Sequence, residues 1–381
     1  MILKDYLNSK PLFYEEIDYA RMPRVYEKVK SSLATPKIVH IIGTNGKGTT
    51  GRFLANALCS MGFYAGHYTS PHILEFNERV WLNGANATNA ELEDAHAELQ
   101  KLLSQSDSDS LSYFEYTTFL AMIIFKKCDY VVMEAGLGGE HDATAVFPKI
   151  LTLVTPIGYD HEAFLGSSIE SIAATKLNAI QNSAILASQN YDEVYKIADK
   201  LKVEKSLNIK KVTEFIDEKD SQKIEQIAKK LSLVPYLRDN LSLSISALNF
   251  LGLKYEIGNF SAAPLFGRVT KISDNIIIDV GHNALAAQGI TEALKGQKFR
   301  LVYNSYRDKN YKEILSILKP IILDVEIIEI ENQRVEGLEN IEKALDELGI
   351  IHTIFKEVKE EQNYLVFGSF SVVEEFLRSY V

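Results

Sequence analysis

Cysteine is scarce in this sequence of 381 residues, which contains only Cys59 and Cys128. Each lies in an apolar stretch of helical pattern, so the sequence excludes a disulfide framework and a thiolate metal site and favours a reducing cytoplasm. Long hydrophobic runs are also lacking, because the longest, Phe119 to Phe125, is far shorter than the roughly 20 residues of a membrane-spanning helix. The N-terminus carries charges at Lys4 and Asp5 and no sustained apolar core, so no secretory signal is predicted.

Basic residues are fewer than acidic residues. The chain has 41 Lys and Arg against 51 Asp and Glu, a formal net charge of −10, which argues against general attraction to nucleic acid or to an anionic membrane. Apolar material is plentiful, since 46% of the residues are hydrophobic, and at this size roughly 75% of the unfolded surface becomes buried. With about 150 residues to a domain, we expect a soluble protein of two domains that needs no disulfide or metal to fold.

Short apolar runs alternate along the chain with stretches of helical period, the pattern of parallel sheets built from strand-helix-strand units. The segment 261–267, SAAPLFG, combines small residues, a proline and a glycine, which favours a hinge. The predicted division is a first domain over 1–262, a hinge at 263–267 and a second α/β domain over 268–381. The predicted strands are 38–42, 64–68, 130–133, 150–155, 276–280, 301–303, 321–330 and 365–367.

Local signals predict individual helices and loops. Ser167 with Glu170 has the spacing of a capping box at a helix start. The run SQSDSDS at 104–110 predicts a flexible polar loop. Residues 191–230 hold ten Lys and nine Asp or Glu with the signs interspersed, which predicts solvated helices and hairpins rather than a binding patch.

The sharpest local signal is the glycine-rich run GTNGKGTT between the predicted strand 38–42 and an amphipathic helix. Glycines let the backbone curl so that several N–H groups and a helix N-terminus converge on phosphate oxygens, and the lysine adds a mobile positive charge. The strict Walker A pattern is missed, because Ile41 stands where its first glycine would fall and Gly48 separates the lysine from the hydroxyl residue. We therefore predict a phosphate-binding turn made of Gly43, Thr44, Asn45, Gly46, Lys47, Gly48, Thr49 and Thr50.

Candidate metal ligands stand where predicted strands end, the edge at which doubly wound sheets bind ligands. Glu134 follows its strand as a Walker B acid does, and Ser70 and His161 follow two others. Taken alone, such an acid is about as often a cap or an ion-pair partner, and an isolated histidine is usually a surface group because Mg²⁺ prefers oxygen ligands. By itself, Lys176 would be a solvated lysine and Phe114 a core aromatic.

Seven motifs occur in order along most of the chain, and together they are far more specific than any one of them. They are GTNGKGTT at 43–50, TSPHILEFNERV at 69–80, YFEYTTF at 113–119, MEAGLGGEHDAT at 133–144, PIGYDHEAFLGSSIESIAATK at 156–176, FGR at 266–268 and DVGHNALAA at 279–287. By these motifs the chain resembles the folylpolyglutamate synthase/dihydrofolate synthase family of the Mur ligase group. The fold implied is α/β, with an N-terminal P-loop ATPase-like domain built on a doubly wound sheet and a smaller C-terminal Rossmann-like domain.

The resemblance implies ATP and Mg²⁺ as cofactors. The turn 43–50 would hold the ATP phosphates, with Lys47 also catalytic, and Ser70, Glu134 and His161 would ligate Mg²⁺, with His161 also at the reacting groups. Lys176 matches a catalytic lysine that is carbamylated in these ligases, which turns an ammonium into a carboxylate that can reach a second metal. Potassium is a further cation that the family implies. The remaining ATP contacts implied are Asn240, Arg268, Asp279 and His282.

For the substrate, the resemblance implies that Phe114 belongs to the pteroate pocket and that Ser369 lies at the glutamate end, with His72 as a further candidate contact. The sequence also departs from the family pattern. Glu140 and His141 replace an arginine and a leucine, Ala145 replaces an asparagine, and Leu177 and Asn178 follow Lys176 where alanine and glycine are common. The exchange of arginine for glutamate reverses a charge in a loop that normally lies near the reacting groups.

The activity implied is an ATP-dependent ligase that adds L-glutamate to dihydropteroate, to reduced folates, or to both through an acyl phosphate. Its partners would be these small molecules, and neither nucleic acid nor a membrane is implied. The resemblance also implies a monomer. Three alternatives remain: a Mur-type ligase with another acid substrate, a P-loop phosphotransferase or kinase, and a nucleotide-binding module without turnover. Dependence on glutamate separates them, because a kinase would release a phosphorylated product without it.

Overall fold

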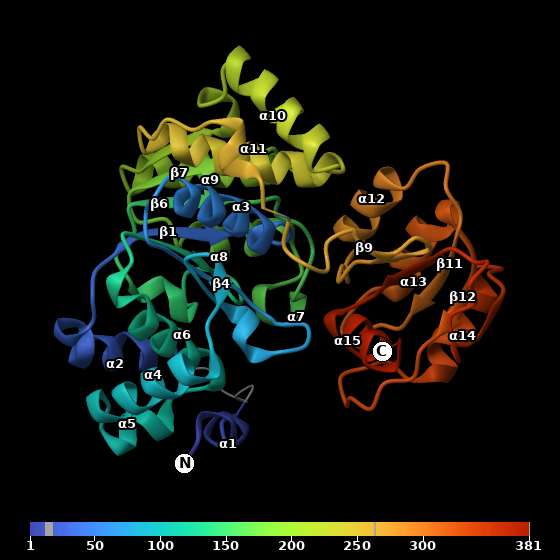
Figure 1. Cartoon of the computed structure of the whole chain (residues 1–381), viewed down its shortest axis with the longest axis horizontal. Coiled ribbons are helices and arrows are strands. Elements are labelled where there is room, and N and C mark those ends of the chain that lie inside the picture. Colours follow the sequence, from blue (N-terminus) through green and yellow to red (C-terminus); the bar gives the residue numbers. More distant parts are fainter. Residues whose placement is uncertain (12–17, 263, 381) are drawn as a thin grey trace.

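The computed structural model describes residues 1–11, 18–262 and 264–380, and it contains two β-sheets with helices packed on them (Figure 1). The first sheet has eight strands and the second has six. The first sheet and its helices form the larger lobe in Figure 1, and the second sheet, in orange and red, forms a smaller lobe beside it. The predicted α/β fold class is confirmed.

The first sheet is parallel except at one edge. Its strands are β1 (Lys37–Ile42), β2 (Ala65–Tyr68), β3 (Val80–Leu82), β4 (Ala85–Asn86), β5 (Tyr130–Glu134), β6 (Leu151–Val154), β7 (Ser183–Leu186) and β8 (Asn208–Lys211). They lie in the order β4-β3-β2-β5-β1-β6-β7-β8, and the pairs β2–β3 and β3–β4 are antiparallel. Because β1 lies between β5 and β6, the chain leaves the carboxyl end of β1 at a point where the sheet winds both ways, the place where such sheets bind ligands.

Helices cover both faces of this sheet. They are α1 (Leu3–Asn8), α2 (Arg21–Val29), α3 (Lys47–Ser60), α4 (Asn89–Leu102), α5 (Gln105–Ser110), α6 (Tyr113–Ile124), α7 (Glu162–Leu165), α8 (Ile169–Leu177), α9 (Asp192–Glu204), α10 (Glu218–Lys230) and α11 (Pro235–Phe250). On β5, Val131 and Met133 pack into the cluster of α4 and α6, and Val132 packs into the cluster of α3 and α11. This alternation explains why the strand is an unbroken apolar run.

The second sheet is also mainly parallel. Its strands are β9 (Thr270–Ser273), β10 (Ile276–Ile278), β11 (Phe299–Tyr303), β12 (Ile322–Ile327), β13 (His352–Ile354) and β14 (Tyr364–Phe367), and its helices are α12 (Ala284–Ala293), α13 (Tyr311–Leu318), α14 (Leu338–Glu347) and α15 (Phe370–Tyr380). The order is β13-β12-β11-β14-β10-β9, with only β9 antiparallel. We call residues 264–380, which hold this sheet and its helices, the second unit, and residues 1–11 and 18–262 the first unit.

Short 3-10 turns complete the chain: Lys30–Ser32, Phe76–Arg79, Phe125–Lys127, Ala143–Val146, Val212–Glu214, Ile257–Phe260 and Lys319–Ile321. The predicted domain boundaries remain a prediction, and residue 263 of the predicted hinge lies outside the described residues. Across 1–11, 18–262 and 264–380, no helix combines the length and the apolar character needed to cross a membrane.

Three local predictions are wrong. The expected loop 104–110 contains helix α5, because the Ser104 side chain accepts a hydrogen bond from the N–H of Asp107 and caps the helix. Helix α8 is capped by Ser168 rather than by the predicted Ser167. The charged segment 191–230 holds helices α9 and α10, as predicted, but its strand β8 forms no hairpin, because β8 pairs parallel with β7.

Candidate active site

The glycine-rich turn 43–50 joins β1 to α3 at the carboxyl edge of the first sheet, as predicted. Gly46 is the N-cap of α3 and has a φ of +88°. The N–H groups of Thr44 and Asn45 donate to the carbonyl oxygen of Pro156, at 3.0 and 3.3 Å, so these two amides anchor the turn. The N–H groups of the first turn of α3 have no carbonyl before them in the helix, and they are the ones available to an anion.

Buried polar groups without partners surround this turn. Asn240 of α11 lies against Gly46, where a Cβ would overlap Oδ1 of Asn240 and lie 3.1 Å from its Cγ. Among the described residues, Nδ2 of Asn240 and the hydroxyls of Thr49 and Thr50 are buried without a hydrogen-bond partner. An unsatisfied buried polar group costs free energy. The cradle therefore fits a ligand with polar atoms of its own, such as ATP.

Lys47 and Glu134 face each other beside the turn. Nζ of Lys47 lies 3.8 Å from Oε1 of Glu134, and both side chains are nearly buried. Glu134 ends β5, and its Oε2 accepts hydrogen bonds from the hydroxyl of Thr69 and, at 3.4 Å, from the N–H of Ser70. Because β2 and β5 are parallel neighbours, their carboxyl ends bring Ser70 to Glu134 as the sequence predicted.

Of the predicted metal ligands, Ser70 and His161 follow β2 and β6, and Glu134 is the last residue of β5. No hydrogen bond or ion pair joins His161 to the other two in the part of the chain that the structure describes, and no cluster of three or more His, Cys, Asp or Glu there could hold a metal ion. Mg²⁺ binds through few protein oxygens and keeps water and phosphate ligands. The carboxylate of Glu134 and the hydroxyl of Ser70 fit that requirement.

His161 and the preceding Asp160 lie at the start of α7. Burial lowers the pKa of His161 to about 4 although the Asp160 carboxylate opposes the shift, so the imidazole is neutral, the form that ligates metals. Burial alone would raise the pKa of Asp160, but His282, His161 and Lys309 hold it well below its usual range. Lys309 belongs to the second unit, and its Nζ lies 2.6 Å from Oδ1 of Asp160.

Lys176 lies on α8 behind the turn and is 3% exposed. Its Nζ donates to the carbonyl oxygen of Gly43 at 3.0 Å. Burial, and then the nearby Lys47 ammonium, lower the pKa of Lys176 to about 7. A sizeable fraction of this amine is therefore neutral and nucleophilic near pH 7.

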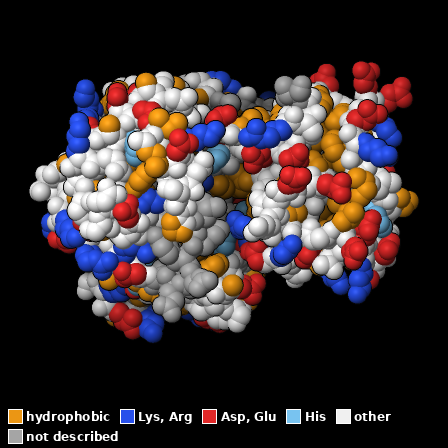
Figure 2. Space-filling view, turned by 90° about the horizontal axis from the view of Figure 1, so that it is seen from below, with side chains coloured by type: hydrophobic (Ala, Val, Ile, Leu, Met, Phe, Trp, Pro, Cys, Tyr) orange, Lys and Arg blue, Asp and Glu red, His pale blue; other side chains and the backbone are white. Residues whose placement is uncertain are grey.

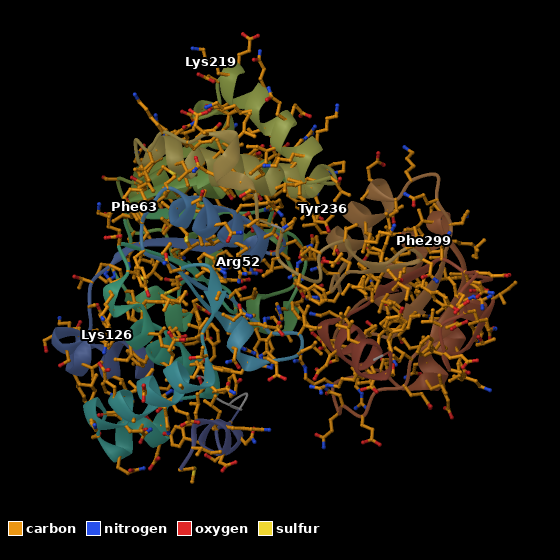
Figure 3. All side chains as sticks on the ribbon, viewed as in Figure 1. Arg52, Phe63, Lys126, Lys219, Tyr236 and Phe299 are labelled. Atoms are coloured by element: carbon orange, nitrogen blue, oxygen red, sulfur yellow. The ribbon has the colours of Figure 1, made fainter. Side chains whose placement is uncertain are left out.

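Asp279 of the second unit is held by three donors. Its carboxylate accepts from the N–H groups of Val269, at 3.0 Å, and Gly281, at 2.7 Å, and from the hydroxyl of Tyr236 at 2.9 Å. Tyr236 comes from α11 in the first unit and lies at the junction of the two lobes (Figure 3). The predicted nucleotide contact Asp279 thus also ties the two units together.

Arg268 and His282 are the other predicted nucleotide contacts of the second unit. Nη1 of Arg268 donates to the carbonyl oxygen of Gly267, and its guanidinium lies 5.3 Å from the ring centroid of Phe370. His282 reaches the first unit, since its Nε2 lies 3.5 Å from Oδ2 of Asp160. Figure 2 shows the molecular surface hollowed between the two lobes.

Phe114 and His72 are two of the predicted substrate contacts. Phe114 stacks on Tyr68, with ring centroids 5.8 Å apart, and its ring covers Gly136 so closely that a Cβ there would overlap it. Nδ1 of His72 accepts from Nε of Arg79 at 2.8 Å. Burial, and then the Arg79 charge, lower the pKa of His72 to about 4, so the ring is neutral.

Ser369, the third predicted substrate contact, is fully buried in the second unit. Its hydroxyl accepts from the N–H of Val372 at 3.1 Å, at the start of α15. The structure gives this serine a helix-capping hydrogen bond, and its role toward glutamate stays a prediction.

The residues that depart from the family pattern are bound to their neighbours. Oε2 of Glu140 accepts from Nδ2 of Asn178 at 3.0 Å, and Oδ1 of Asn178 accepts from Nζ of Lys205 at 2.9 Å. The ring of His141 packs on Tyr19 with centroids 4.3 Å apart. Two of the departures, at 140 and 178, are therefore in direct contact.

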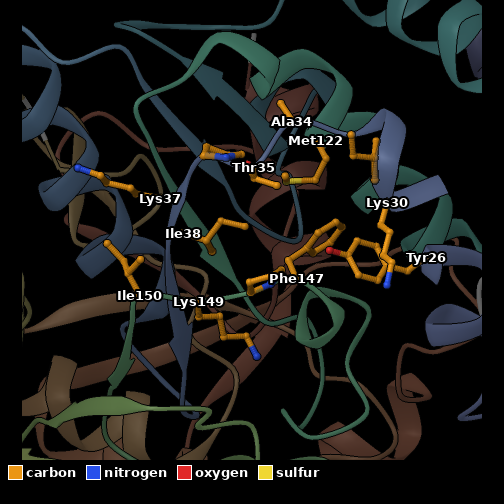
Figure 4. Close-up of a pocket in the computed structure, with 13 residues that line it drawn as sticks. Tyr26, Lys30, Ala34, Thr35, Lys37, Ile38, Met122, Phe147, Lys149 and Ile150 are labelled. Atoms are coloured by element: carbon orange, nitrogen blue, oxygen red, sulfur yellow. The ribbon is translucent and has the colours of Figure 1, made fainter. Parts of the chain in front are cut away.

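A cavity of about 240 Å³ lies at the opposite edge of the first sheet (Figure 4). Its walls include Ile38 and Ile150, next to the amino ends of β1 and β6, together with Phe147 and Met122. Lys149 also lines it, but its ammonium donates to the carbonyls of Ala145 and Ala179. None of the predicted site residues lines this cavity.

Sequence reasoning missed four residues at the site: Thr69, Tyr236, Asn283 and Lys309. Tyr236 precedes Asn240 by four residues, so the helical period would have placed both on one face of α11. Thr69 and Asn283 lie within the family motifs at 69–80 and 279–287. Lys309 gave no signal, because it follows Arg307 and Asp308 in an ordinary charged run.

The chain is similar to known folate ligases over almost its whole length. It is 32% identical over 378 residues to the dihydrofolate synthase/folylpolyglutamate synthase of Buchnera aphidicola subsp. Baizongia pistaciae, which covers 90% of this chain and 86% of the relative. The crystal structure of Helicobacter pylori folylpolyglutamate synthetase has a TM-score of 0.81 and 39% identity and covers 99% of this chain and 97% of that one.

The Yersinia pestis bifunctional folylpolyglutamate synthase/dihydrofolate synthase, complexed with AMPPNP and Mn ion, has a TM-score of 0.82 and 25% identity, with 99% of this chain and 96% of that one covered. A scan against protein-family models gave no match.

Proposed function

Because the chain belongs to the dihydrofolate synthase/folylpolyglutamate synthase family, we propose that it forms an amide bond between L-glutamate and the carboxylate of dihydropteroate, of reduced folates, or of both, at the expense of ATP. A divalent cation accompanies the nucleotide, in keeping with the AMPPNP and Mn ion bound to the Yersinia pestis relative. A Mur-type ligase for another acid and a P-loop phosphotransferase are not favoured, because the similarity to folate ligases runs over 90% or more of the chain.

One observation carries the proposal: the Lys47 ammonium and the Glu134 carboxylate face each other, 3.8 Å apart, at the mouth of the phosphate turn. The lysine supplies positive charge to phosphate oxygens. The carboxylate, with the hydroxyl of Ser70 and the neutral imidazole of His161, would hold Mg²⁺. Bound Mg²⁺ adds positive charge against the charge that develops on the transferring phosphoryl group.

The reaction needs activation because a carboxylate and an amine do not condense directly, since hydroxide or oxide would have to leave. The carboxylate oxygen of the substrate attacks the γ-phosphorus of ATP, ADP leaves, and an acyl phosphate forms. The amine of glutamate then attacks the acyl carbon, the C–O bond to phosphate breaks, and the nitrogen loses a proton to give the amide. Lys47 stabilises negative charge in the first step.

The second unit keeps water from the acyl phosphate. Arg268 and His282 stand on its side of the hollow, and closure of the two units brings them onto the nucleotide. Tyr236 and Asp279, hydrogen-bonded at 2.9 Å, hold the two units together beside α11.

Lys176 is carbamylated in the working enzyme. Its neutral amine adds to the carbon of CO₂ and releases one proton, which leaves a carboxylate on Nζ. The lowered pKa of Lys176, about 7, supplies the neutral amine for this step. After equilibration with ¹³C-bicarbonate, NMR should show a carbamate signal in the unaltered chain that is lost in Lys176→Met. A signal of equal intensity in both chains would refute the assignment.

The test of the function is a phosphate-release assay with ATP, Mg²⁺ and glutamate, run separately with dihydropteroate and with tetrahydrofolate. We expect release only when glutamate and one of these acids are both present. Lys47→Ala should abolish the product and the acyl phosphate alike, whereas Lys37→Ala, at the amino end of β1, should leave both unchanged. Release of a phosphorylated product over many turnovers without glutamate would identify a phosphotransferase, and full activity of Lys47→Ala would overturn the mechanism.

A further inference from the structure

We propose that Asn283 and Lys309 of the second unit are positioning residues for the phosphate-binding turn, which they hold through Asn45 and Asp160. We call these four side chains the latch. They come from four separate places: the turn after β1, the loop after β6, the start of α12 and the loop before α13. The inference rests on the proposed function, because it concerns the same turn, but it adds residues from the other unit.

Asn45 and Asn283 form a reciprocal amide pair across the junction. Nδ2 of Asn45 donates to Oδ1 of Asn283 at 2.8 Å, and Nδ2 of Asn283 donates to Oδ1 of Asn45 at 3.0 Å. Oδ1 of Asn283 also accepts from the N–H of Ala286, which caps α12, and its Nδ2 also donates to Oδ2 of Asp160. Both hydrogens and both lone pairs of the Asn283 amide are thus used, so its orientation is fixed.

Asp160 and Lys309 form a buried ion pair beside this amide. Their charged atoms lie 2.6 Å apart, and their side chains are 5% and 4% exposed. Lys309 also lies 3.1 Å from the half-exposed Asp308 of its own unit. Removing the ammonium while the two units stay docked would leave the Asp160 carboxylate buried without this cationic partner, which is strongly unfavourable.

The latch acts on the turn at the point where an anion would bind. Asn45 lies next to Gly46, the N-cap of α3, and its own N–H donates to the carbonyl of Pro156. Its backbone is therefore held by the first unit and its side chain by the second. It follows that docking of the second unit and binding of a nucleotide at the turn favour each other by the same factor.

The test compares full-length variants that remove one latch contact at a time. Lys309→Met deletes the ammonium and keeps the length of the side chain. Asn283→Ser keeps a residue that can cap α12 but cannot form the amide pair. Lys312→Met is the matched control, because Lys312 is half exposed and its ion-pair partner among the described residues is Glu347, which also belongs to the second unit.

Three measurements apply: the affinity for ADP by calorimetry, the radius of gyration in solution without nucleotide, and hydrogen exchange of the amides at 44–49. Lys309→Met and Asn283→Ser should weaken ADP binding by about 5- to 150-fold, the usual range of coupling between sites. They should also increase the radius of gyration and speed exchange at the turn, and Lys309→Arg should recover part of each effect. Lys312→Met should match the unaltered chain.

The outcomes separate this inference from the proposed function. If both latch variants match Lys312→Met in radius, exchange and ADP affinity, the latch does not position the turn. If the unaltered chain makes no amide product while the latch variants still loosen the turn and the junction, the proposed function fails and the positioning role stands. Circular dichroism and urea unfolding check that each variant is folded, and if Lys309→Met is not, Asn283→Ser carries the test.

Discussion

Replacing Gly46 by alanine tests the geometry of the phosphate turn most directly. Two effects add at this position. The φ of +88° disfavours any L side chain, and the new Cβ would overlap Oδ1 of Asn240. Because Asn240 lies on α11, the substitution probes a contact between two segments that are far apart in the sequence.

A second glycine separates the two effects. Gly62 has a φ of +91°, and nothing lies within 4 Å of the position its Cβ would take. Gly62→Ala should therefore lower the free energy of unfolding only by the backbone term, about 1–2 kcal/mol. Gly46→Ala carries the same term together with overpacking against Asn240, which costs about 1–3 kcal/mol. We expect Gly46→Ala to be the more destabilising by that second amount.

Urea unfolding of the two variants, and of Gly46→Ala combined with Asn240→Ala, measures the difference. The double variant should recover the overpacking term, and Asn240→Ala alone completes the cycle. Calorimetry should also show that Gly46→Ala weakens ADP binding while Gly62→Ala does not. Equal unfolding free energies for Gly46→Ala and Gly62→Ala, within about 0.5 kcal/mol, would refute the packing of Asn240 on the turn.

Three further predictions follow from the site. The pKa of Lys176, about 7 in the folded chain, lies below its ordinary value of 10.5, so the unfolded chain binds more protons between these values. The free energy of unfolding should therefore rise with pH over this range more steeply in the unaltered chain than in Lys176→Met. If the urea midpoint changes by the same amount between pH 7 and about pH 9.5 in both chains, this expectation is wrong. Glu134→Gln should raise the Mg²⁺ concentration for half-maximal phosphate release by about tenfold or more, with Glu140→Gln as the control; an unchanged Mg²⁺ requirement would remove Glu134 from the metal site. Phe114→Leu should raise KM for the pterin acid and leave KM for ATP unchanged in steady-state kinetics, whereas equal changes in both would assign Phe114 a structural role.

The first sheet and the core of the site could be predicted because their signals are local. A buried parallel strand is an unbroken apolar run, and the turn after β1 is marked by glycines whose conformation other residues disfavour. Parallel strands also end at one edge of the sheet, so the meeting of Ser70 with Glu134 followed from their places after two strands. The roles of these residues came from the resemblance to a family.

The contacts between the two units could not be predicted. Lys309 meets Asp160 across 149 positions, and Tyr236 meets Asp279 across 43, and no periodicity links such residues. The polar composition of 104–110 hid helix α5, because Ser104 offers a helix cap that composition does not reveal. Strand β8 was missed since it lies at the sheet edge with only Ile209 buried among charged neighbours.

Because Glu140, Asn178 and Lys205 are linked by consecutive hydrogen bonds, a substitution at one of these positions affects the other two. One amide joins a carboxylate on one side to an ammonium on the other. An arginine restored at 140 alone would face the donor end of Asn178 with no acceptor to meet it. Any redesign of this loop toward the commoner family sequence should therefore begin at 178 and 205, at the ends of α8 and α9, rather than at 140 itself.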